Sequence, residues 1–562
     1  MSETEGDVAL RCLFAFVDQL AYEGLEHASV SPGSRSTPIA LAFARHPRIN
    51  VHVHLDERAS AFFGLGVAKA TQKPAAVVTT SGTAATELFP AVVEASMSRA
   101  PLLLLTGDRP PELRGVGANQ TIDQTELFGA YVQTYLETPV PGEDPDDWGW
   151  RQRAEFVMTT AVGHRPGPVH VNVPLREPLA PSSDPDLKQA GRRVATRSIF
   201  EALPAELGVL LDEMRATPHG ILVAGSLRES ERDLLRLAER LAWPVLAEPT
   251  SGLRVPGTLA AGQFLVSNER FVADHIPDVV VQVGAAPTTR AGLAFVARGG
   301  RLWIVDPDDL VADPNRVATG RVVLPLRHVA RAIDRIPARE DDGWRTAWVD
   351  ADQRARGAVD VAIDAWDEPF EGRVARDVAG CLPDGSALVV GSSMPVRDLD
   401  VYMRPRDGLR VLANRGASGI DGFVSTALGV AATGVRTTVL CGDLTLLHDV
   451  GSLLWNARLG YDAVFVVPNN DGGAIFSFLP QRELPEFEEL FVTPHGLDLA
   501  AVCVAAGTGH ELVRHADALI PAIERVHDAG GVHVIEVPSD RDENVRRHAE
   551  VHEAVAAALG GS

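Results

Sequence analysis

Short apolar runs alternate with segments of helical period along most of the chain. In the first third, such runs lie at 27–31, 50–54, 75–80 and 101–106, and all but the second end in a loop rich in Gly, Ser, Thr or Pro. Apolar runs of about four to eight residues bounded by turn residues are typical of buried strands. Similar runs recur later, at 221–225, 244–247, 278–283, 302–305, 388–391, 438–441 and 463–467. This order of strand, loop and helix predicts an α/β protein with three doubly wound parallel-sheet domains.

Two polar, proline-containing segments divide the chain at 181–197 and 337–344, and both are typical of linkers. We therefore expect three domains, at 1–182, 198–336 and 345–562. A prior of about 150 residues per domain agrees with three or four domains in a chain of 562 residues. The first and third domains repeat the same strand, glycine loop and helix pattern, so they look like a duplicated pair.

Two of the late apolar runs end in residues that could bind a metal ion. The run at 438–441 ends in Gly442 and Asp443, and the run at 463–467, after a single predicted helix, leads to Asn470 and Gly472. Parallel strands bring their carboxyl ends to one edge of a sheet, so Asp443 and Asn470 should emerge at the same edge. A carboxylate, an amide oxygen and a backbone carbonyl suit Mg²⁺. An ordinary Asp turn and Asn-Gly loop would have the same sequence, and that alternative stays open.

A candidate anion site follows the first predicted strand. A segment of helical period at 8–28 leads into this strand, and the loop at 32–38, with Ser34 and Arg35, precedes another predicted helix. A helix N-terminus presents free amides and the positive end of the helix dipole, and arginine adds a bidentate donor for carboxylate or phosphate. A capped turn with a solvated arginine is the alternative.

An acidic residue opens the helix after the second predicted strand. Glu57 follows the run at 50–54 and precedes an apolar segment rich in Ala, Phe and Gly. Acidic residues in a first helical turn are often only partners of the helix dipole, which is the alternative here. A further loop, at 109–124, carries polar side chains that could form hydrogen bonds with a substrate, and an ordinary surface loop would have the same character.

Composition narrows the function classes. A net charge of −23 argues against nucleic acid or an anionic membrane as partner, because both require a basic surface. The acidic N-terminus and the lack of an apolar run near the roughly 20 residues of a membrane span favour a cytoplasmic protein. The four cysteines form no CxxC pair, so neither a disulfide framework nor a zinc site is indicated. Only three of the 52 basic residues are lysines.

Six blocks of the sequence together resemble one enzyme family. They are SPGSRSTP at 31–38, LDERASAFFGLG at 55–66, GDRPPELRGVGANQ at 107–120, NRGASGIDG at 414–422, GDL at 442–444 and NNDGGAIFSFLP at 469–480. These blocks closely resemble the 2-succinyl-5-enolpyruvyl-6-hydroxy-3-cyclohexene-1-carboxylate synthase family, the thiamine diphosphate enzymes of menaquinone biosynthesis. The resemblance spans all three predicted domains.

The resemblance implies thiamine diphosphate as cofactor, between the first and third domains, with Mg²⁺, or Mn²⁺ in its place, as the metal. It implies decarboxylation of 2-oxoglutarate and conjugate addition of the succinyl carbanion equivalent to isochorismate. Both substrates are dicarboxylates, which would account for a site rich in arginine in an otherwise acidic protein. The family likeness also implies a site between two chains, in a homodimer or a dimer of dimers.

Individual roles follow from the same resemblance. Glu57, with a raised pKa, would share a proton with the aminopyrimidine ring, and Arg397 and Arg415 would join it as catalytic residues. Ile420 would support the bent cofactor, and Ile475 with Phe476 would form an apolar wall. Further cofactor contacts are expected from Ser81, Gly82, Ser393, Gly442, Asp443, Leu444 and Asn470, with metal ligands Asp443, Asn470 and Gly472. Substrate contacts are expected from Ser34, Arg35, Arg109, Asn119, Gln120, Arg290, Arg397 and Arg415.

Two other functions stay open. A related 2-oxo-acid decarboxylase or acetolactate-type carboligase would share Glu57, Asp443 and Asn470, but it would not need four arginines for two dicarboxylates. A thiamine diphosphate-binding protein without activity would not require Glu57. Release of carbon dioxide from 2-oxoglutarate and from pyruvate, with and without isochorismate, separates these possibilities.

Overall fold

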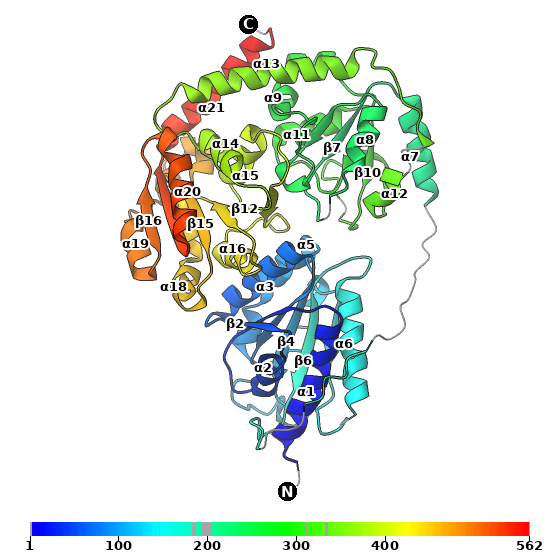
Figure 1. The fold of residues 1–562 in the computed structure, drawn as a ribbon, viewed down its shortest axis with the longest axis vertical. Helices are drawn as coiled ribbons and strands as arrows, with labels where there is room; N and C mark the ends of the chain where they lie inside the picture. The colour runs from blue at the N-terminus through cyan, green and yellow to red at the C-terminus, as the bar shows by residue number, and fades with distance from the viewer. Residues whose placement is uncertain are drawn as a thin grey trace. The chain divides into compact units, whose positions relative to one another are not determined.

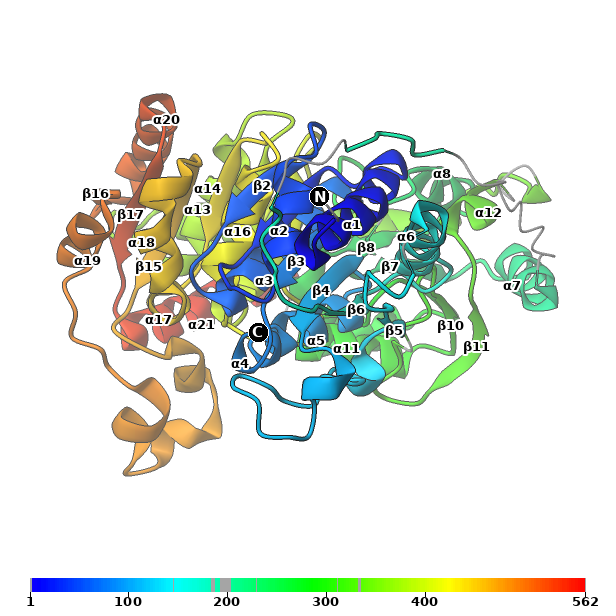
Figure 2. The same ribbon diagram turned by 90° about the horizontal axis from the view of Figure 1, so that it is seen from below.

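The computed structural model divides the chain into two compact units. The first unit combines 1–199 with 414–434 and 448–461, and the second contains 200–413, 435–447 and 462–562. Figures 1 and 2 colour the chain by residue number. The structure describes residues 3–144, 146–182, 187–192, 204–228, 230–310, 312–331 and 335–560.

The first unit is built on a six-stranded parallel sheet of order β2-β1-β3-β4-β6-β5. Its strands are β1 (His27–Val30), β2 (Asn50–Val53), β3 (Ala75–Thr79), β4 (Leu102–Asp108), β5 (Thr134–Glu137) and β6 (Val169–Pro174). Every residue of β3, β4 and β6 is buried, as expected for central strands covered by helices on both faces.

The helices of the first unit cover both faces of this sheet. Ala76 and Val78 belong to the apolar core formed with α1 and α2, whereas Val77 lies against Gly64 of α3 on the opposite face. The helices are α1 (Glu5–Tyr22), α2 (Thr37–Ala44), α3 (Glu57–Thr71), α4 (Thr83–Thr86), α5 (Phe89–Met97), α6 (Asp147–Ala161), α16 (Phe423–Ala431) and α18 (Val450–Leu459), with 3₁₀ turns η1 (Pro111–Leu113) and η2 (Gly129–Tyr131). Helices α1 and α6 run side by side (Figure 1).

Helices α3 and α16 approach each other closely through glycine. A Cβ atom at Gly66 of α3 would lie 2.0 Å from the carbonyl oxygen of Thr426, and one at Gly429 of α16 would lie 2.1 Å from that of Phe63. Only residues without a side chain allow this backbone contact. The apolar, glycine-containing helix after Glu57 is therefore explained by its contact with α16.

The second unit contains two parallel sheets. The middle sheet has the order β11-β10-β9-β7-β8, and the last sheet has the order β13-β12-β14-β15-β17-β16. Middle strands are β7 (Gly220–Ala224), β8 (Val245–Ala247), β9 (Val279–Val283), β10 (Arg301–Val305) and β11 (Ala318–Val322). Last-sheet strands are β12 (Ala387–Val390), β13 (Arg410–Ala413), β14 (Thr437–Leu440), β15 (Ala463–Asn469), β16 (Gly509–Leu512) and β17 (Val532–Pro538).

Helices of the second unit connect these strands in the alternating order of an α/β fold. They are α7 (Ala205–Ala216), α8 (Asp233–Arg240), α9 (Gly262–Ser267), α10 (Glu269–Asp274), α11 (Arg290–Arg298), α12 (Leu326–Ala330), α13 (Trp344–Asp364), α14 (Glu371–Cys381), α15 (Met394–Tyr402), α17 (Asp443–His448), α19 (Leu499–Ala506), α20 (Leu519–Ala529) and α21 (Arg541–Ala558). Short turns are η3 (Pro249–Ser251), η5 (Ala474–Phe478), η6 (Pro480–Glu483), η7 (Glu488–Val492) and η8 (Ala516–Ala518).

The first and last sheets have the same topology. When the strands of each sheet are numbered along the chain, both sheets read 2-1-3-4-6-5, and the middle sheet reads 2-1-3-4-5. In such sheets the strand order reverses between the first and third strands, and ligands commonly bind there, at the carboxyl ends of the strands. The three doubly wound parallel sheets confirm the predicted fold class. The exact domain boundaries stay a prediction.

Several details differ from the sequence-based expectations. The first helix spans Glu5–Tyr22, not 8–28, because Thr4 and Asp7 form a capping box that starts it earlier. The single helix predicted after Asp443 is two helices, α17 and α18, which meet at Asp449. The second linker ends where α13 begins at Trp344, and residues 183–186 and 193–197 of the first linker lie outside the described residues. Six strands were missed: β5, β6, β11, β13, β16 and β17.

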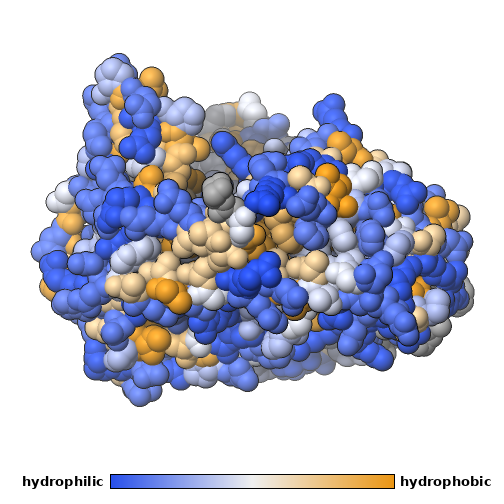
Figure 3. Space-filling view, turned by 90° about the horizontal axis from the view of Figure 1, so that it is seen from above, coloured by the Kyte–Doolittle hydropathy of each residue, from blue (hydrophilic) through white to orange (hydrophobic). Residues whose placement is uncertain are grey.

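The described helices include none that is both long and apolar enough to cross a bilayer. The face seen in Figure 3 is largely hydrophilic with hydrophobic side chains interspersed, in keeping with a chain in which 23% of residues are charged.

Candidate active site

A pocket of about 660 Å³ lies at the carboxyl edge of the first sheet. Its walls come from the loops that follow β1, β2 and β3 and from the loop after β4, so it occupies the point where the strand order reverses. The structure brings three predicted site residues together here: Ser34, Glu57 and Gln120. Asp56 and Glu87 line the same pocket and were not predicted.

Glu57 is the first residue of α3 and is partly buried. The side chain of Asp56 caps this helix by accepting a hydrogen bond from the Ala59 amide at 3.1 Å, which fixes where Glu57 emerges. Burial raises the pKa of the Glu57 carboxyl, and the nearby charges of Asp56 and Glu87 raise it further. A carboxyl with a raised pKa is better suited to hold and release a proton near neutral pH.

Arg35 and Arg109 are buried cations near this pocket. Arg35 donates hydrogen bonds to the Leu175 carbonyl at 2.8 Å and to Glu177 Oε1 at 2.9 Å. The Arg109 guanidinium donates to the Ser81 hydroxyl, and its pKa is lowered first by burial and then by the charge of Arg35. Because the two guanidinium groups repel each other, an anion bound between them would be stabilised by both.

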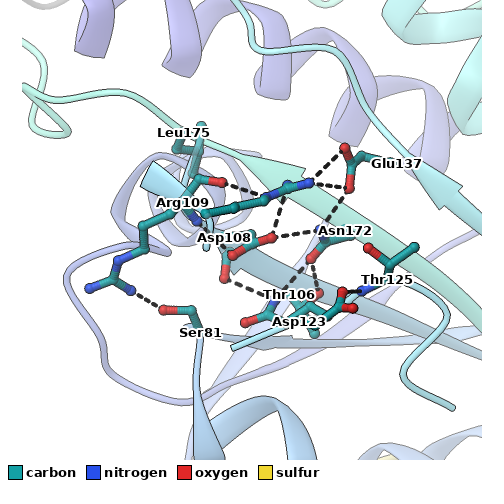
Figure 4. Close-up of polar contacts among 12 residues, drawn as sticks. Ser81, Thr106, Asp108, Arg109, Asp123, Thr125, Glu137, Asn172 and Leu175 are labelled. Carbon is teal, nitrogen blue, oxygen red and sulfur yellow. Dashed lines mark hydrogen bonds and ion pairs between the residues drawn. The ribbon is translucent and has the colours of Figure 1, made fainter. Parts of the chain in front are cut away.

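A polar network supports the loops that carry Ser81 and Arg109 (Figure 4). The Gly82 amide donates to Gln124 Oε1 at 3.1 Å, and Gln124 Nε2 donates to Asn172 Oδ1 at 2.9 Å. Asn172 Nδ2 in turn donates to Asp108 Oδ2 at 3.0 Å, directly before Arg109. Asn172 was missed by the sequence reasoning, although the alternation of valine with polar residues at 169–173 is a signal that could have indicated β6.

The loop of residues 414–422 carries Arg415 and Ile420, both partly buried, and belongs to the first unit with Glu57.

Gln120 is held by reciprocal bonds, since Ser81 Oγ donates to its carbonyl at 3.0 Å and its Nε2 donates to the Ser81 carbonyl at 3.0 Å. Asn119 is exposed.

Asp443 lies in the second unit as the first residue of α17, and only 1% of it is exposed. Its Oδ1 accepts from the Leu444 amide at 2.6 Å, and its Oδ2 accepts from the Gly472 amide at 2.9 Å. The His495 ring lies 3.4 Å from Oδ2. Burial raises the pKa of Asp443, while these hydrogen bonds and His495 oppose the rise. The two predicted motifs are thus in direct contact.

Asn470 presents an oxygen suited to a cation. Its Nδ2 donates to Glu371 Oε1 at 3.0 Å, and Glu371 also accepts from Ser539 Oγ at 2.9 Å. Asn470 Oδ1 is buried and has no hydrogen-bond partner among the described residues. The described part of the chain has no group of three His, Cys, Asp or Glu side chains that could hold a metal ion. The predicted ligand set does not require such a group, because it consists of one carboxylate, one amide oxygen and one backbone carbonyl. This donor set suits Mg²⁺.

The other predicted residues of the second unit are distributed over three regions. Ser393 has a positive φ of 72°, which is rare for a residue with a side chain, and its carbonyl accepts a hydrogen bond from Arg397. Ile475 and Phe476 are partly buried in η5, and Gly442 and Leu444 flank Asp443. Arg290 is exposed at the start of α11, beside the middle sheet.

Three family models match the chain in sequence order. The N-terminal TPP binding domain of thiamine pyrophosphate enzymes matches residues 12–127, their middle domain matches 210–390, and their C-terminal TPP binding domain matches 396–537. Thiamine pyrophosphate is thiamine diphosphate by another name. Proteins named 2-succinyl-5-enolpyruvyl-6-hydroxy-3-cyclohexene-1-carboxylate synthase match along nearly the whole chain. Those of Thermobifida fusca and Chloroflexus aurantiacus are 41% and 39% identical, covering 97% of this chain and 98% and 96% of the relatives.

The chain belongs to this synthase family. The synthase of Geobacillus thermodenitrificans is likewise 40% identical over 96% of this chain and 95% of its own length. Two solved structures share the fold of this chain at lower sequence identity. Benzoylformate decarboxylase from Polynucleobacter necessarius has a TM-score of 0.73 at 20% identity, covering 94% of this chain and 99% of its own. A putative thiamin diphosphate-dependent enzyme from Mycobacterium smegmatis has a TM-score of 0.70 at 21% identity, with the same coverage.

Proposed function

We propose that this protein is a thiamine diphosphate- and Mg²⁺-dependent synthase that decarboxylates 2-oxoglutarate and adds the resulting succinyl unit to isochorismate. The observation that carries the proposal is about 40% identity to proteins named for this product along 97% of the chain. The cofactor, when bound, supplies the carbanion chemistry that decarboxylation of a 2-oxo acid requires.

Residues of the first unit would transfer the cofactor's proton and bind the substrates. Glu57, with its raised pKa, is assigned to hold and return the proton of the aminopyrimidine ring. Arg35 and Arg109 are assigned to isochorismate, because two close guanidinium groups suit its carboxylates. Arg415 is assigned to the distal carboxylate of 2-oxoglutarate, together with Arg397 of the second unit. The remaining assigned contacts are Ser34, Asn119, Gln120 and Arg290 for the substrates, and Ser81, Gly82, Ser393, Ile420, Ile475 and Phe476 for the cofactor.

Asp443, Asn470 and the carbonyl of Gly472 would hold Mg²⁺ or Mn²⁺, beside Gly442 and Leu444. The unpartnered oxygen of Asn470 and the buried carboxylate of Asp443 support this assignment. The Gly472 carbonyl accepts from the Ala474 amide at 3.0 Å and keeps a second lone pair. We also propose that the enzyme acts in the cytoplasm as a homodimer or a dimer of dimers.

The proposal is tested by measuring carbon dioxide release from 2-oxoglutarate and from pyruvate, with and without isochorismate, in the presence of Mg²⁺ and thiamine diphosphate. We expect release from 2-oxoglutarate only, and formation of the adduct when isochorismate is present. Preferred release from pyruvate would instead assign an acetolactate-type carboligase or a related decarboxylase. Cofactor binding without release from either acid would assign a binding protein.

A further inference from the structure

A buried ion pair in the first unit holds the loop that carries Arg415. Glu94 lies on α5 with 3% of its surface exposed, and Lys69 lies on the last turn of α3 with 8% exposed. Lys69 Nζ donates to Glu94 Oε1 at 2.8 Å. Charges as buried as these are costly unless they are paired and hydrogen-bonded, so the pair requires further partners.

Those partners are the residues on either side of Arg415. Glu94 Oε1 accepts from the Gly416 amide at 3.0 Å, and Oε2 accepts from the Ala417 amide at 2.7 Å. On the other side, Lys69 Nζ donates to Asn414 Oδ1 at 2.9 Å. Asn414 Nδ2 in turn donates to Thr426 Oγ1 at 3.0 Å, which ties the loop to α16.

The glycine after Arg415 is explained by the same contact. A Cβ atom at Gly416 would lie 2.7 Å from the Glu94 carbonyl oxygen and 2.9 Å from Met97 Cβ. Any larger residue would move the loop away from α5 and lengthen the two bonds to the Glu94 carboxylate. The loop backbone is therefore fixed immediately before and immediately after Arg415.

We propose that Glu94 and Lys69 are positioning residues, which fix the backbone of the loop so that Arg415 holds the first substrate in one orientation. A bidentate guanidinium depends on the position and plane of its fork, and small displacements weaken it. The same helix α3 begins at Glu57 and ends near Lys69, so one rigid element sets both the proton-transfer carboxyl and the arginine loop. This inference rests on the proposed role of Arg415 in binding 2-oxoglutarate.

The main test is Glu94→Gln, which keeps the shape of the side chain and removes its charge. We expect the KM for 2-oxoglutarate to rise about tenfold, because hydrogen bonds to a charged group are replaced by weaker ones. The KM for isochorismate and the affinity for thiamine diphosphate should stay within about twofold of the wild type. Hydrogen exchange, followed by mass spectrometry without substrate, should be about tenfold faster for the amides of Gly416 and Ala417.

Asp18→Asn is the matched control. Asp18 is an equally buried carboxylate of the first unit, paired with Arg151 at 2.6 Å and bonded to the amides of Ala190 and Gly191. Its replacement should lower the Tm without changing the KM for 2-oxoglutarate or the exchange of the 416–417 amides. Glu94→Gln should also lower the Tm, because it leaves the buried charge of Lys69 without its carboxylate. The double variant Glu94→Gln/Lys69→Met removes that charge, so it should recover part of the lost Tm while the KM stays raised.

A normal KM and normal exchange in Glu94→Gln would overturn the proposal, and so would a KM that recovers together with Tm in the double variant. If Glu94→Gln does not fold, Asn414→Ala tests the loop from its other side with the same readouts. A third outcome is faster exchange of the Gly416 and Ala417 amides in Glu94→Gln, with a normal KM for 2-oxoglutarate both in that variant and in Arg415→Lys. This result would overturn the role of Arg415 and leave the loop contact established.

Discussion

The first and last sheets share one strand order, but the loops after corresponding strands carry different chemistry. The loop after the second strand provides Glu57 in the first sheet and Arg415 in the last. The loop after the third strand provides Gly82 in the first sheet and Asp443 in the last. The shared topology therefore determines where functional side chains emerge from each sheet. The residue type at each position determines whether the loop can bind a cation, bind an anion or exchange a proton.

The two carboxylates show how strongly the surroundings matter. Glu57 and Asp443 each begin a helix after a parallel strand, and burial raises the pKa of both. Asp443 accepts two backbone hydrogen bonds and faces His495, whereas no described residue outside its own backbone donates a hydrogen bond to the Glu57 carboxylate. A fixed carboxylate suits a metal ion, and a carboxyl without fixed partners suits proton exchange.

The largest effect is expected at the metal side of this comparison. Asp443→Ala should abolish Mg²⁺-dependent binding of thiamine diphosphate while the fold stays intact, because the only carboxylate of the predicted ligand set is lost. In the wild type, saturating cofactor and Mg²⁺ should raise Tm, because a ligand that binds only the folded state stabilises it. The variant should unfold at its own Tm whether or not both are added. A normal cofactor-induced rise would remove Asp443 from the metal site.

Replacing Glu57, the carboxyl assigned to proton transfer, should reduce activity without preventing cofactor binding. Glu57→Gln should still bind cofactor, but its activity should fall by about 10² to 10⁴, because an amide cannot exchange the proton that activation requires. NMR in heavy water, following exchange of the thiazolium proton of bound cofactor, measures this step directly. Near-normal exchange in the variant would contradict the role of Glu57.

The arginines should divide the two substrates. Arg415→Lys should impair use of 2-oxoglutarate by roughly ten- to hundredfold, because lysine keeps the charge but loses the bidentate fork. Arg35→Lys and Arg109→Lys should chiefly raise the KM for isochorismate. Separate assays of decarboxylation and of the addition step distinguish the two groups. Decarboxylation at normal rate and affinity in Arg415→Lys would rule out its assignment, leaving a role in bracing the loop.

The smallest effect is expected at Glu371, which contacts the predicted metal ligand Asn470. Glu371→Gln should lower Mg²⁺ affinity by about tenfold, because a side chain that orients a ligand typically contributes this much. Glu371 is buried and accepts a hydrogen bond from Asn470 Nδ2, so its replacement allows the Asn470 amide to turn. Titration of Mg²⁺ at fixed cofactor concentration measures the change. Glu368→Gln, an exposed acid on the same segment, is the control, and equal affinities in all three proteins would be inconsistent with the orienting role.

Much of this arrangement could be predicted from the sequence because it is local. Apolar runs that end in glycine or serine loops predicted most of the central strands, but not β6 and β17. The positions just after the predicted strands identified Glu57, Asp443 and Asn470 as candidate site residues. The strands β5, β11 and β16 were missed because they lie at sheet edges and most of their residues are not fully buried. The helix after Asp443 was predicted as one, since the break at Asp449 has no proline or glycine before it.

The supporting residues could not be predicted, because their partners are distant in sequence. Glu94 is 322 positions from Gly416, and Glu371 is 99 positions from Asn470. Nothing in the sequence around either carboxylate indicates a buried hydrogen bond to a functional loop. Only the packing of α3, α5 and α14 brings these groups to their partners.

Calorimetric titration of thiamine diphosphate with Mg²⁺ into Glu57→Gln and Asp443→Asn tests the central difference most directly, because each change replaces one carboxylate oxygen with an amide nitrogen. We expect that Glu57→Gln binds cofactor with nearly wild-type affinity and that Asp443→Asn does not bind it measurably. Equal affinities in the two variants, or the reverse order, would contradict the assignment of proton transfer to the first sheet and metal binding to the last.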